Sequence, residues 1–195
     1  ESREDLIELK WLIDNGYKFS NVFDADVLEN FSKVYVSPGI SNTNPVLMQA
    51  NFLNIEIETD IDIFLRIHSC IKILISGTNG KTTVTSMSRK LFSDYLGNKR
   101  VEALGNIGNA VLDNIDEDID IALVEVSSYQ LELSSSISSD IAVLLNVTQD
   151  HLDRHSSFED YKSIKKKIFN ESKLVIKDGQ SDLSTKECFY FKEIF

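Results

Sequence analysis

The chain has 195 residues, of which 42% are hydrophobic and 26% charged, and this globular composition excludes a wholly disordered chain or a collagen-like fibre. Thirty-one acidic residues against 20 basic ones give a net charge of -11. That field repels a nucleic-acid backbone, so duplex DNA is not an expected partner, whereas a small anionic ligand responds to its local site and stays compatible.

The amino-terminal third of the chain is predicted to alternate short helices with short strands. Apolar residues at helical spacing or a start signal such as Asn44-Pro45 predict helices at 6–13, 27–31, 45–53 and 60–67. Strands are predicted at 33–37 and 55–57, and Ser37-Pro38-Gly39 ends the first of them as a turn. Asp60 is the expected N-cap of the helix at 60–67.

The rest of the chain is predicted to form a larger α/β unit. Short apolar runs predict strands at 71–75, 121–126, 141–146 and 174–176, and helical patterns cover 81–96 and 158–169. Apolar strands with helices between them indicate a largely parallel sheet that is covered on both faces. We expect two domains, 1–68 and 69–195.

The loop after the strand at 71–75 carries the strongest signal for phosphate binding. Its residues are Gly77, Thr78, Asn79, Gly80, Lys81, Thr82 and Thr83. A strand that passes through a glycine-bearing turn into a helix points backbone N–H groups and the positive helix end at one place, which suits a polyphosphate. Lys81 would neutralise the outer phosphates, and the Thr82 hydroxyl would suit Mg²⁺. Ile75 breaks the strict GxxxxGK[ST] pattern, so a chance Gly-Lys-Thr loop is the alternative.

Two further segments place polar groups near the predicted sheet. Glu125 ends an apolar strand and is therefore expected at the carboxyl edge of the sheet, where open α/β folds bind ligands. It could hold a metal shared with the phosphates, or it could simply pair with Lys81. The segment 105–108, Gly-Asn-Ile-Gly, precedes another predicted helix, and by itself it is typical of a structural turn.

The segments 145–155 and 158–169 complete the set of candidates. The first has two Asp and two His within six residues, which is a poor zinc site because no Cys lies nearby. His151 could join a magnesium or substrate cluster, or the loop could be structural. The second segment is predicted to be an amphipathic helix with Tyr161 inward. A lysine among several positive neighbours there can have a lowered pKa, and a neutral amine captures CO₂ as a carbamate.

Together these segments resemble the Mur ligases. The matching segments occur in the order and approximate spacing of that family, at 77–83, 105–108, 125–132, 146–154 and 161–165. The SSYQLE sequence at 127–132 is most similar to the D-glutamate-adding member. The resemblance covers nearly the whole chain and is most specific from 71 to 169.

The resemblance implies an ATP-dependent amide ligase of peptidoglycan precursor synthesis. Such an enzyme adds D-glutamate to UDP-N-acetylmuramoyl-L-alanine through an acyl phosphate and uses ATP with Mg²⁺. The implied fold is a Rossmann-like N-terminal domain, here lacking its first strand, followed by a P-loop-type central ATPase domain that is incomplete. We therefore expect a partial enzyme with little or no activity in isolation.

The resemblance also implies roles for individual residues. The loop 77–83 would hold the ATP phosphates, and the catalytic residues would be Lys81, His151 and Lys165. Thr82 and Glu125 would bind one Mg²⁺, and His151 with a carbamylated Lys165 would support a second. The expected substrate contacts are Asn106, Ser127 and Gln130 for muramoyl-alanine, and Arg3, Ser37 and Gly39 for uridine diphosphate.

Several alternatives stay open at this point. They are another Mur-type ligase such as the meso-diaminopimelate-adding one, a folylpolyglutamate synthase, a P-loop kinase or GTPase, and a non-catalytic nucleotide-binding module. No apolar run approaches the roughly 20 residues that span a bilayer, and no signal-peptide pattern opens the chain. Cys70 and Cys188 lie far apart and predict reduced thiols in a cytoplasmic protein. The sequence does not give the oligomeric state.

Overall fold

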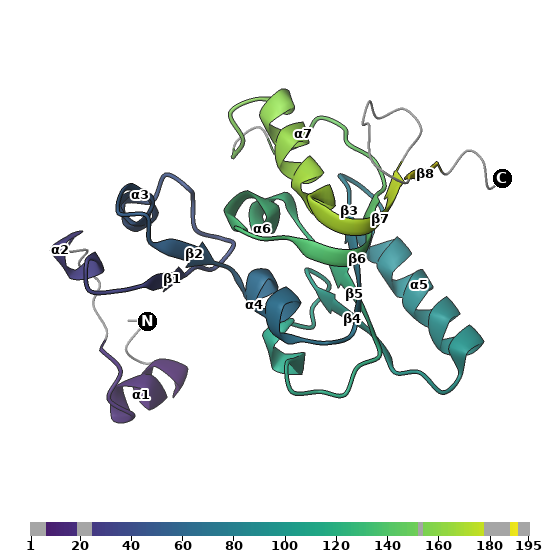
Figure 1. Ribbon diagram of the computed structural model, residues 1–195, viewed down its shortest axis with the longest axis horizontal. Coiled ribbons are helices and arrows are strands. Elements are labelled where there is room, and N and C mark those ends of the chain that lie inside the picture. Colours follow the sequence, from purple (N-terminus) through teal and green to yellow (C-terminus); the bar gives the residue numbers. More distant parts are fainter. Residues whose placement is uncertain (1–6, 19–24, 152–153, 178–187, 191–195) are drawn as a thin grey trace.

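The protein is described by a computed structural model that covers residues 7–18, 25–151, 154–177 and 188–190. It contains two sheets, a two-stranded sheet of order β1-β2 and a six-stranded sheet of order β4-β5-β3-β6-β7-β8. Every pair of neighbouring strands is parallel. The predicted α/β fold with a largely parallel sheet is therefore confirmed (Figure 1).

The first third of the chain forms the predicted elements α1 (Ile7–Asp14), α2 (Ala25–Leu28), β1 (Lys33–Tyr35), α3 (Pro45–Phe52), β2 (Glu56–Glu58) and α4 (Asp60–Ile67). Of these, β1 and β2 make the smaller sheet. The prediction of Asp60 as the N-cap of α4 is wrong, because Thr59 holds that position. The Thr59 hydroxyl accepts from the Asp62 amide at 3.3 Å, and the Asp62 carboxylate accepts from the Thr59 amide at 2.8 Å. This reciprocal capping box satisfies two otherwise free N–H groups of the helix.

The larger sheet contains the predicted strands and others that the sequence did not reveal. Its elements are β3 (Ile71–Ser76), α5 (Lys81–Leu96), β4 (Val101–Gly105), β5 (Ile121–Glu125), α6 (Ser128–Leu133), β6 (Ser138–Leu144), α7 (Phe158–Lys166), β7 (Glu171–Lys177) and β8 (Cys188–Tyr190). Short 3₁₀ turns lie at Leu112–Asn114 and Lys167–Phe169. We did not predict β4, α6 or β8. The prediction of a helix after Gly108 is wrong, since only the short 3₁₀ turn at Leu112–Asn114 forms there.

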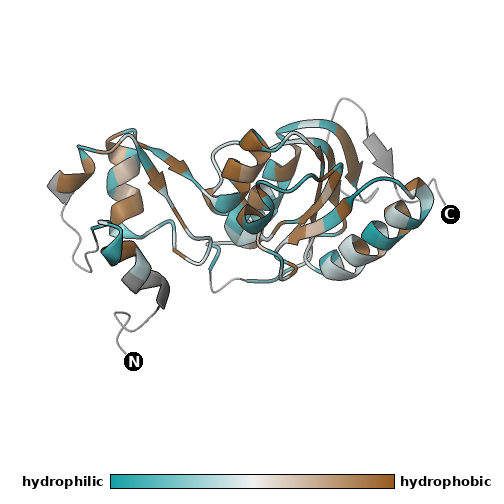
Figure 2. Ribbon diagram, turned by 90° about the horizontal axis from the view of Figure 1, so that it is seen from below, coloured by the Kyte–Doolittle hydropathy of each residue, from teal (hydrophilic) through white to brown (hydrophobic). Residues whose placement is uncertain are grey.

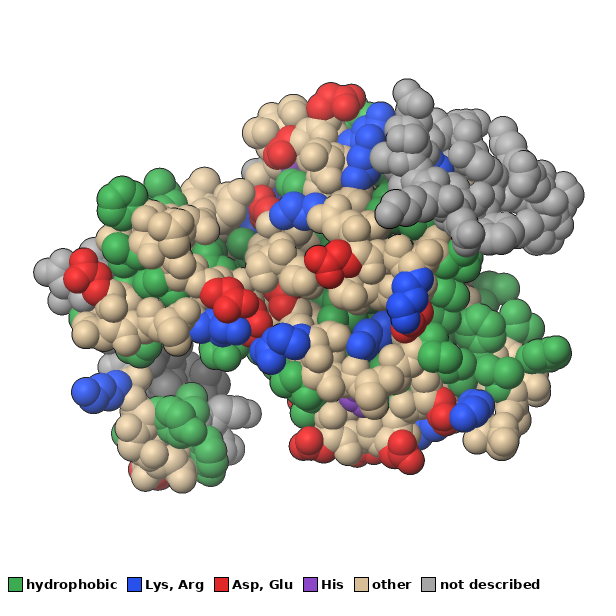
Figure 3. All heavy atoms as spheres, in the orientation of Figure 1, with side chains coloured by type: hydrophobic (Ala, Val, Ile, Leu, Met, Phe, Trp, Pro, Cys, Tyr) green, Lys and Arg blue, Asp and Glu red, His purple; other side chains and the backbone are tan. Residues whose placement is uncertain are grey.

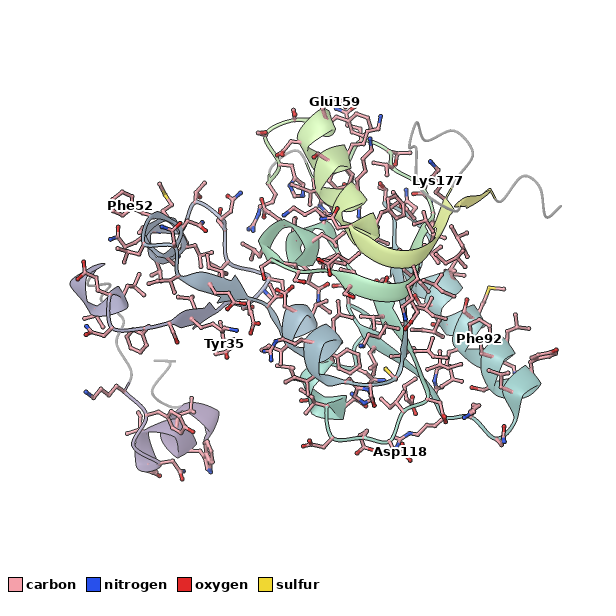
Figure 4. The ribbon with its side chains drawn as sticks, viewed as in Figure 1. Tyr35, Phe52, Phe92, Asp118, Glu159 and Lys177 are labelled. Carbon is pink, nitrogen blue, oxygen red and sulfur yellow. The ribbon has the colours of Figure 1, made fainter. Side chains whose placement is uncertain are left out.

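The core lies on both faces of the larger sheet, because successive residues of each strand point to opposite faces. In β3, Leu74 faces α4, α6 and α7, whereas Ile73 and Ile75 face α5. Figure 1 shows α5 on one side of the sheet and the other three helices on the opposite side. The hydrophobic strands lie between these helices in Figure 2. Phe92 of α5, labelled in Figure 4, packs against the cluster that contains Ile73 and Ile75.

The connection between the two sheets runs through α4. Ile61, Phe64 and Leu65 of this helix are buried in the core of the larger sheet, so α4 is packed with the unit that follows it. The predicted boundary between 1–68 and 69–195 stays a prediction. On the face seen in Figure 3, basic and acidic side chains lie next to each other near this connection, where Glu58 pairs with Lys33 and Arg66. In the described part of the chain, no helix is long and apolar enough to cross a membrane.

Gly105 at the end of β4 allows a close approach that other residues would prevent. Its φ is +91°, and a Cβ there would lie closer than 3.0 Å to the Glu125 carbonyl oxygen. Gly108 has a similar φ of +100° but open space around it. We predict that Gly108→Ala lowers the free energy of unfolding by about 1–2 kcal/mol through the left-handed backbone alone. Gly105→Ala should cost about 1–3 kcal/mol more, because the clash adds to that strain.

Urea unfolding of both variants beside the wild type measures this difference. Equal losses of stability in the two variants would show that the close contact between β4 and β5 contributes nothing.

Candidate functional site

A pocket of about 370 Å³ lies at the carboxyl edge of the larger sheet. Because β5, β3 and β6 are adjacent and parallel, the loops that follow these strands meet there. The pocket is lined by Pro38, Gly39, Lys81, Asn106, Ser127, Ser128, Tyr129, Gln130, His151, Tyr161 and Lys165. This edge is where open α/β sheets bind ligands. The structure thus brings together residues that we predicted from separate segments: Gly39, Lys81, Asn106, Ser127, Gln130, His151 and Lys165.

The loop at 77–80 is held by the segment that follows β6. The Thr78 amide donates to the Asn146 carbonyl oxygen at 3.0 Å, and the Asn79 amide donates to Asn146 Oδ1 at 2.9 Å. In return, Asn146 Nδ2 donates to the Asn79 carbonyl at 3.0 Å, and the Thr148 amide donates to Thr78 Oγ1 at 3.0 Å. The loop is therefore ordered before any ligand arrives, which lowers the entropic cost of binding.

The same loop leads directly into the amino end of α5. Gly80 precedes the helix with φ +82°, a left-handed conformation that glycine adopts without strain. Lys81 Nζ donates to the carbonyl oxygens of Gly77 and Thr78, each at 3.0 Å. Thr82 and Thr83 are exposed in the first turn of the helix. An anion above this turn would meet free backbone N–H groups, the hydroxyl groups of Thr82 and Thr83, and the ammonium of Lys81.

Glu125 is a buried carboxylate with one oxygen unused. Asn106 Nδ2 donates to Glu125 Oε1 at 3.0 Å, while Oε2 has no hydrogen-bond partner. A buried carboxylate oxygen without a partner is costly unless a cation binds it. The alternative pairing with Lys81 is not among the ion pairs of the described residues, so the residues present fit a cation that binds Glu125.

The chemistry of the donor set indicates which cation would fit. In the described part of the chain, no group of three or more His, Cys, Asp or Glu side chains could hold a metal. Mg²⁺ takes one or two protein carboxylates and completes its shell with water and phosphate oxygens. One carboxylate beside a phosphate loop therefore suits Mg²⁺ that arrives with a nucleotide.

Lys165 is a buried lysine in the pocket wall. It is 1% exposed, its Nζ donates to Ser76 Oγ at 3.3 Å, and it lies 5.1 Å from the centre of the Tyr161 ring. Burial, with the positive charge of Lys81 as a second cause, lowers its pKa from 10.5 to about 7, and Asp150 opposes this shift. We had attributed a lowered pKa to charged neighbours in general, but burial is the larger cause and the neighbour is Lys81.

His151 lies at the rim of the pocket between two polar side chains. Its Nδ1 is 3.3 Å from the Tyr129 hydroxyl, and its Nε2 is 3.5 Å from Asp150 Oδ2. The backbone of His151 is left-handed, with φ +52°, which is uncommon for a residue with a Cβ and is found most often at functional sites and turns.

Only some of the predicted substrate contacts line the pocket. Asn106, Ser127, Gln130 and Gly39 line the pocket, whereas Ser37 is exposed and does not. Ser127 and Gln130 also form the capping box of α6, in which Gln130 Oε1 accepts from the Ser127 amide at 3.0 Å. This bond gives both residues a structural role whether or not they meet substrate. Arg3 lies outside the described residues.

The sequence analysis missed several groups that support the site. Tyr161 was predicted only to pack inward, and it is fully buried, but its hydroxyl is 3.1 Å from Thr78 Oγ1. Ser76 links Lys165 to the sheet, since its hydroxyl donates to the Val126 carbonyl at 2.8 Å. A serine at the end of the apolar run 71–75 was the signal that could have revealed it.

Comparisons with known proteins identify similar chains. A family model described as the Mur ligase middle domain matches residues 75–183. The UDP-N-acetylmuramoylalanine–D-glutamate ligase of Buchnera aphidicola subsp. Schizaphis graminum is 42% identical over 161 residues, which are 82% of this chain and 36% of the relative. The enzyme of the same name from Pseudomonas syringae pv. syringae is 34% identical over 161 residues, 83% of this chain and 36% of the relative.

A solved structure shows the fold. The structure of a UDP-N-acetylmuramoyl-L-alanyl-D-glutamate–2,6-diaminopimelate ligase superposes with a TM-score of 0.50 at 19% identity. The superposition covers 75% of this chain and 42% of the ligase's chain. The chain spans about a third of the length of the curated relatives that it matches.

The lowered pKa of Lys165 predicts a pH-dependent stability. Below about pH 7 the folded protein carries a buried ammonium, so Lys165→Met should raise the free energy of unfolding by a few kcal/mol. As the pH rises from about 7 to 10.5, the folded state has lost this proton and the unfolded state still binds it. The wild type therefore gains stability with rising pH, and the difference in unfolding free energy between Lys165→Met and the wild type should disappear.

Chemical denaturation from pH 6 to 10 measures the effect, with Lys162→Met on the same helix as the control. A difference between Lys165→Met and the wild type that stays constant over this range would contradict the lowered pKa.

Proposed function

The chain belongs to the Mur ligase family, since the family model matches more than half of it, and from this premise we propose that it is the ATP-binding part of a D-glutamate-adding ligase. The substrate would be UDP-N-acetylmuramoyl-L-alanine, as the names of the 34–42% identical relatives suggest. The observation that supports this proposal best is the meeting of Lys81, His151 and Lys165 in one pocket at the sheet edge. The expected cytoplasmic location belongs to the same proposal.

The proposed reaction has two steps. A carboxylate oxygen of the muramoyl-alanine substrate forms a bond to the γ-phosphorus of ATP, while the bond from that phosphorus to the β–γ bridging oxygen breaks and ADP leaves. The neutral amine of D-glutamate then attacks the carbonyl carbon of the acyl phosphate, loses a proton and expels inorganic phosphate. Both steps crowd negative charges together, so catalysis depends on positioning and charge neutralisation.

The phosphate loop and the sheet edge supply that neutralisation. Lys81 Nζ, which now contacts the Gly77 and Thr78 carbonyl oxygens, would turn to the outer phosphates when ATP binds. The Thr82 hydroxyl and the free oxygen of Glu125 would hold Mg²⁺, while Asn106 keeps the Glu125 carboxylate in place through Oε1. Mg²⁺ bound there would reduce the charge on the phosphate that is attacked.

Lys165 has the properties that a carbamate requires. With a pKa of about 7, a large fraction of its amine is neutral at physiological pH. The nitrogen would form a bond to the carbon of CO₂ and lose one proton, which leaves a carbamate anion. The cation of Lys81 would stabilise that anion, and the carbamate with His151 would support a second Mg²⁺. A carbamate in place of the ammonium form of Lys165 would remove the like-charge repulsion between that form and Lys81.

Two alternatives make different predictions. A non-catalytic nucleotide-binding module gives no reason to bury an amine of low pKa beside the phosphate loop. Another ligase of the family would use the same ATP site and differ in the amino acid that it adds. Amino-acid competition in the longer enzyme separates that case from D-glutamate addition.

The first test of the proposal is nucleotide binding. We predict that the chain binds Mg²⁺–ATP and that Lys81→Ala raises the dissociation constant roughly 10- to 100-fold, because a charge-assisted contact to phosphate is lost. Lys90→Ala on the exposed face of the same helix should leave it unchanged. Isothermal titration calorimetry gives these constants. Unchanged affinity in Lys81→Ala would remove the phosphate loop from the proposal.

The second test addresses the carbamate. In ¹³C-bicarbonate buffer near pH 8 we expect a carbamate resonance in the ¹³C NMR spectrum of the wild type, since most Lys165 amines are neutral there. Lys165→Met should lack the resonance, and Lys162→Met should keep it. A resonance that persists in Lys165→Met would assign the carbamate to another amine, and its absence from the wild type would count against the proposal.

A further inference from the structure

Glu132, close to the end of α6, joins two separate parts of the chain. Its Oε2 accepts from Arg154 Nε at 2.9 Å and from Arg154 Nη2 at 2.7 Å. Its Oε1 accepts from Asn42 Nδ2 at 3.0 Å. The side chain of Glu132 is 6% exposed and that of Arg154 is 14% exposed, so water has little access to the ion pair. Removing one partner would leave the other buried and uncompensated.

Arg154 contacts the loop at 37–44 directly as well. Its Nη2 donates to the Ile40 carbonyl oxygen at 2.7 Å, and its guanidinium lies 5.1 Å from the centre of the Tyr129 ring. The Tyr129 face and the Glu132 carboxylate fix the guanidinium in one orientation. The planar donor set of arginine suits this arrangement, in which one group bonds a carboxylate and a carbonyl together.

His155 does not compete for the Glu132 carboxylate. This imidazole is buried, and burial lowers its pKa. Its Nε2 is 3.1 Å from Ser128 Oγ, while its Nδ1 is 4.0 Å from Glu132 Oε1, beyond hydrogen-bond distance. The carboxylate is therefore shared between Arg154 and Asn42.

The loop at 37–44 supplies a wall of the pocket. Pro38 and Gly39 line it, and the other lining residues lie between Lys81 and Lys165. In the part of the chain that the structure describes, the hydrogen bonds between this loop and the larger unit go to Glu132 or Arg154. Within the described residues, the hydrogen bonds that join this wall to the larger unit therefore all involve the two members of one ion pair.

We propose that Glu132 and Arg154 are positioning residues that hold the loop 37–44 over the pocket. The ligand served by this wall would be the uridine-diphosphate-linked substrate, and this part of the inference rests on the proposed function. ATP would bind at the opposite side, on the loop at 77–83. Loss of the ion pair should thus loosen the wall and weaken binding of the sugar nucleotide, and it should spare ATP.

Hydrogen–deuterium exchange of the 195-residue protein tests the positioning role. Arg154→Gln should speed exchange of the peptide 37–44 by about tenfold or more, because hydrogen bonds to charged groups are lost locally. Glu132→Gln should act in the same way, and the double variant should add little to either. The matched control is Arg89→Gln, which breaks the Arg89–Glu102 pair of 3.0 Å on the larger unit and should leave 37–44 unchanged.

A second variant covers the case in which the buried substitutions unfold the protein. Asn42 is exposed, so Asn42→Ala should fold and speed exchange of 37–44 several-fold. Wild-type exchange there in folded Arg154→Gln would overturn the inference. If Arg154→Gln does not fold, wild-type exchange of 37–44 in Asn42→Ala would overturn the inference. Equal acceleration of exchange throughout the chain would also overturn it, because that result indicates a merely structural role.

Ligand binding separates this inference from the proposed function. The dissociation constant of UDP-N-acetylmuramoyl-L-alanine should rise several-fold in Arg154→Gln, whereas that of the Mg²⁺ complex of AMP-PNP should not change. If the loop loosens and the sugar nucleotide still binds as in the wild type, the positioning role is overturned. If the wild type binds neither ligand, the proposed function fails, and the exchange result still decides whether the ion pair holds the loop.

Discussion

The parallel pairing of β5, β3 and β6 is the constraint on which the candidate site depends. Ile75 of β3 is in register with Glu125 of β5, and Ser76 of β3 with Leu144 of β6. This register ends three strands at the same level, so segments separated by 50 to 70 positions in sequence meet within hydrogen-bond distance. A shift in register would separate the phosphate loop from Asn146 and Thr148, which hold it.

The site places a lysine ammonium in a chain whose net charge is negative. The protein has a net charge of -11, yet Lys81 and Lys165 both line the pocket, and the charge of Lys81 helps to lower the pKa of Lys165. Glu125 is the buried carboxylate at this edge, and one of its oxygens is still free. An anionic ligand at this edge therefore meets the ammonium of Lys81, which the mean charge of the chain does not reveal.

Local patterns in the sequence were enough for most of the elements but not for the contacts between them. The helix predicted at 81–96 has the bounds of α5, because glycine and the apolar spacing mark both ends. The strand β4 was missed, since Glu102 and Gly105 interrupt its short apolar run. The bonds that join the loop 77–80 to Asn146, and those that join Asn42 to Glu132, connect residues distant in sequence. No local pattern predicts such pairs, so the phosphate loop and the sheet edge could be predicted as separate motifs, while their mutual support could not.

Lys81 Nζ donates to two carbonyl oxygens of its own loop, and these oxygens compete with any anionic ligand for the ammonium. A nucleotide that binds Lys81 as proposed would have to displace these internal bonds, so its affinity would be the difference between two sets of contacts. A ligand with concentrated negative charge would gain more interaction free energy with the ammonium than the two internal bonds lose. A nucleoside without phosphates would not. Selectivity for a polyphosphate tail over the free base and sugar would thus depend on the bonds that the loop itself offers to its lysine.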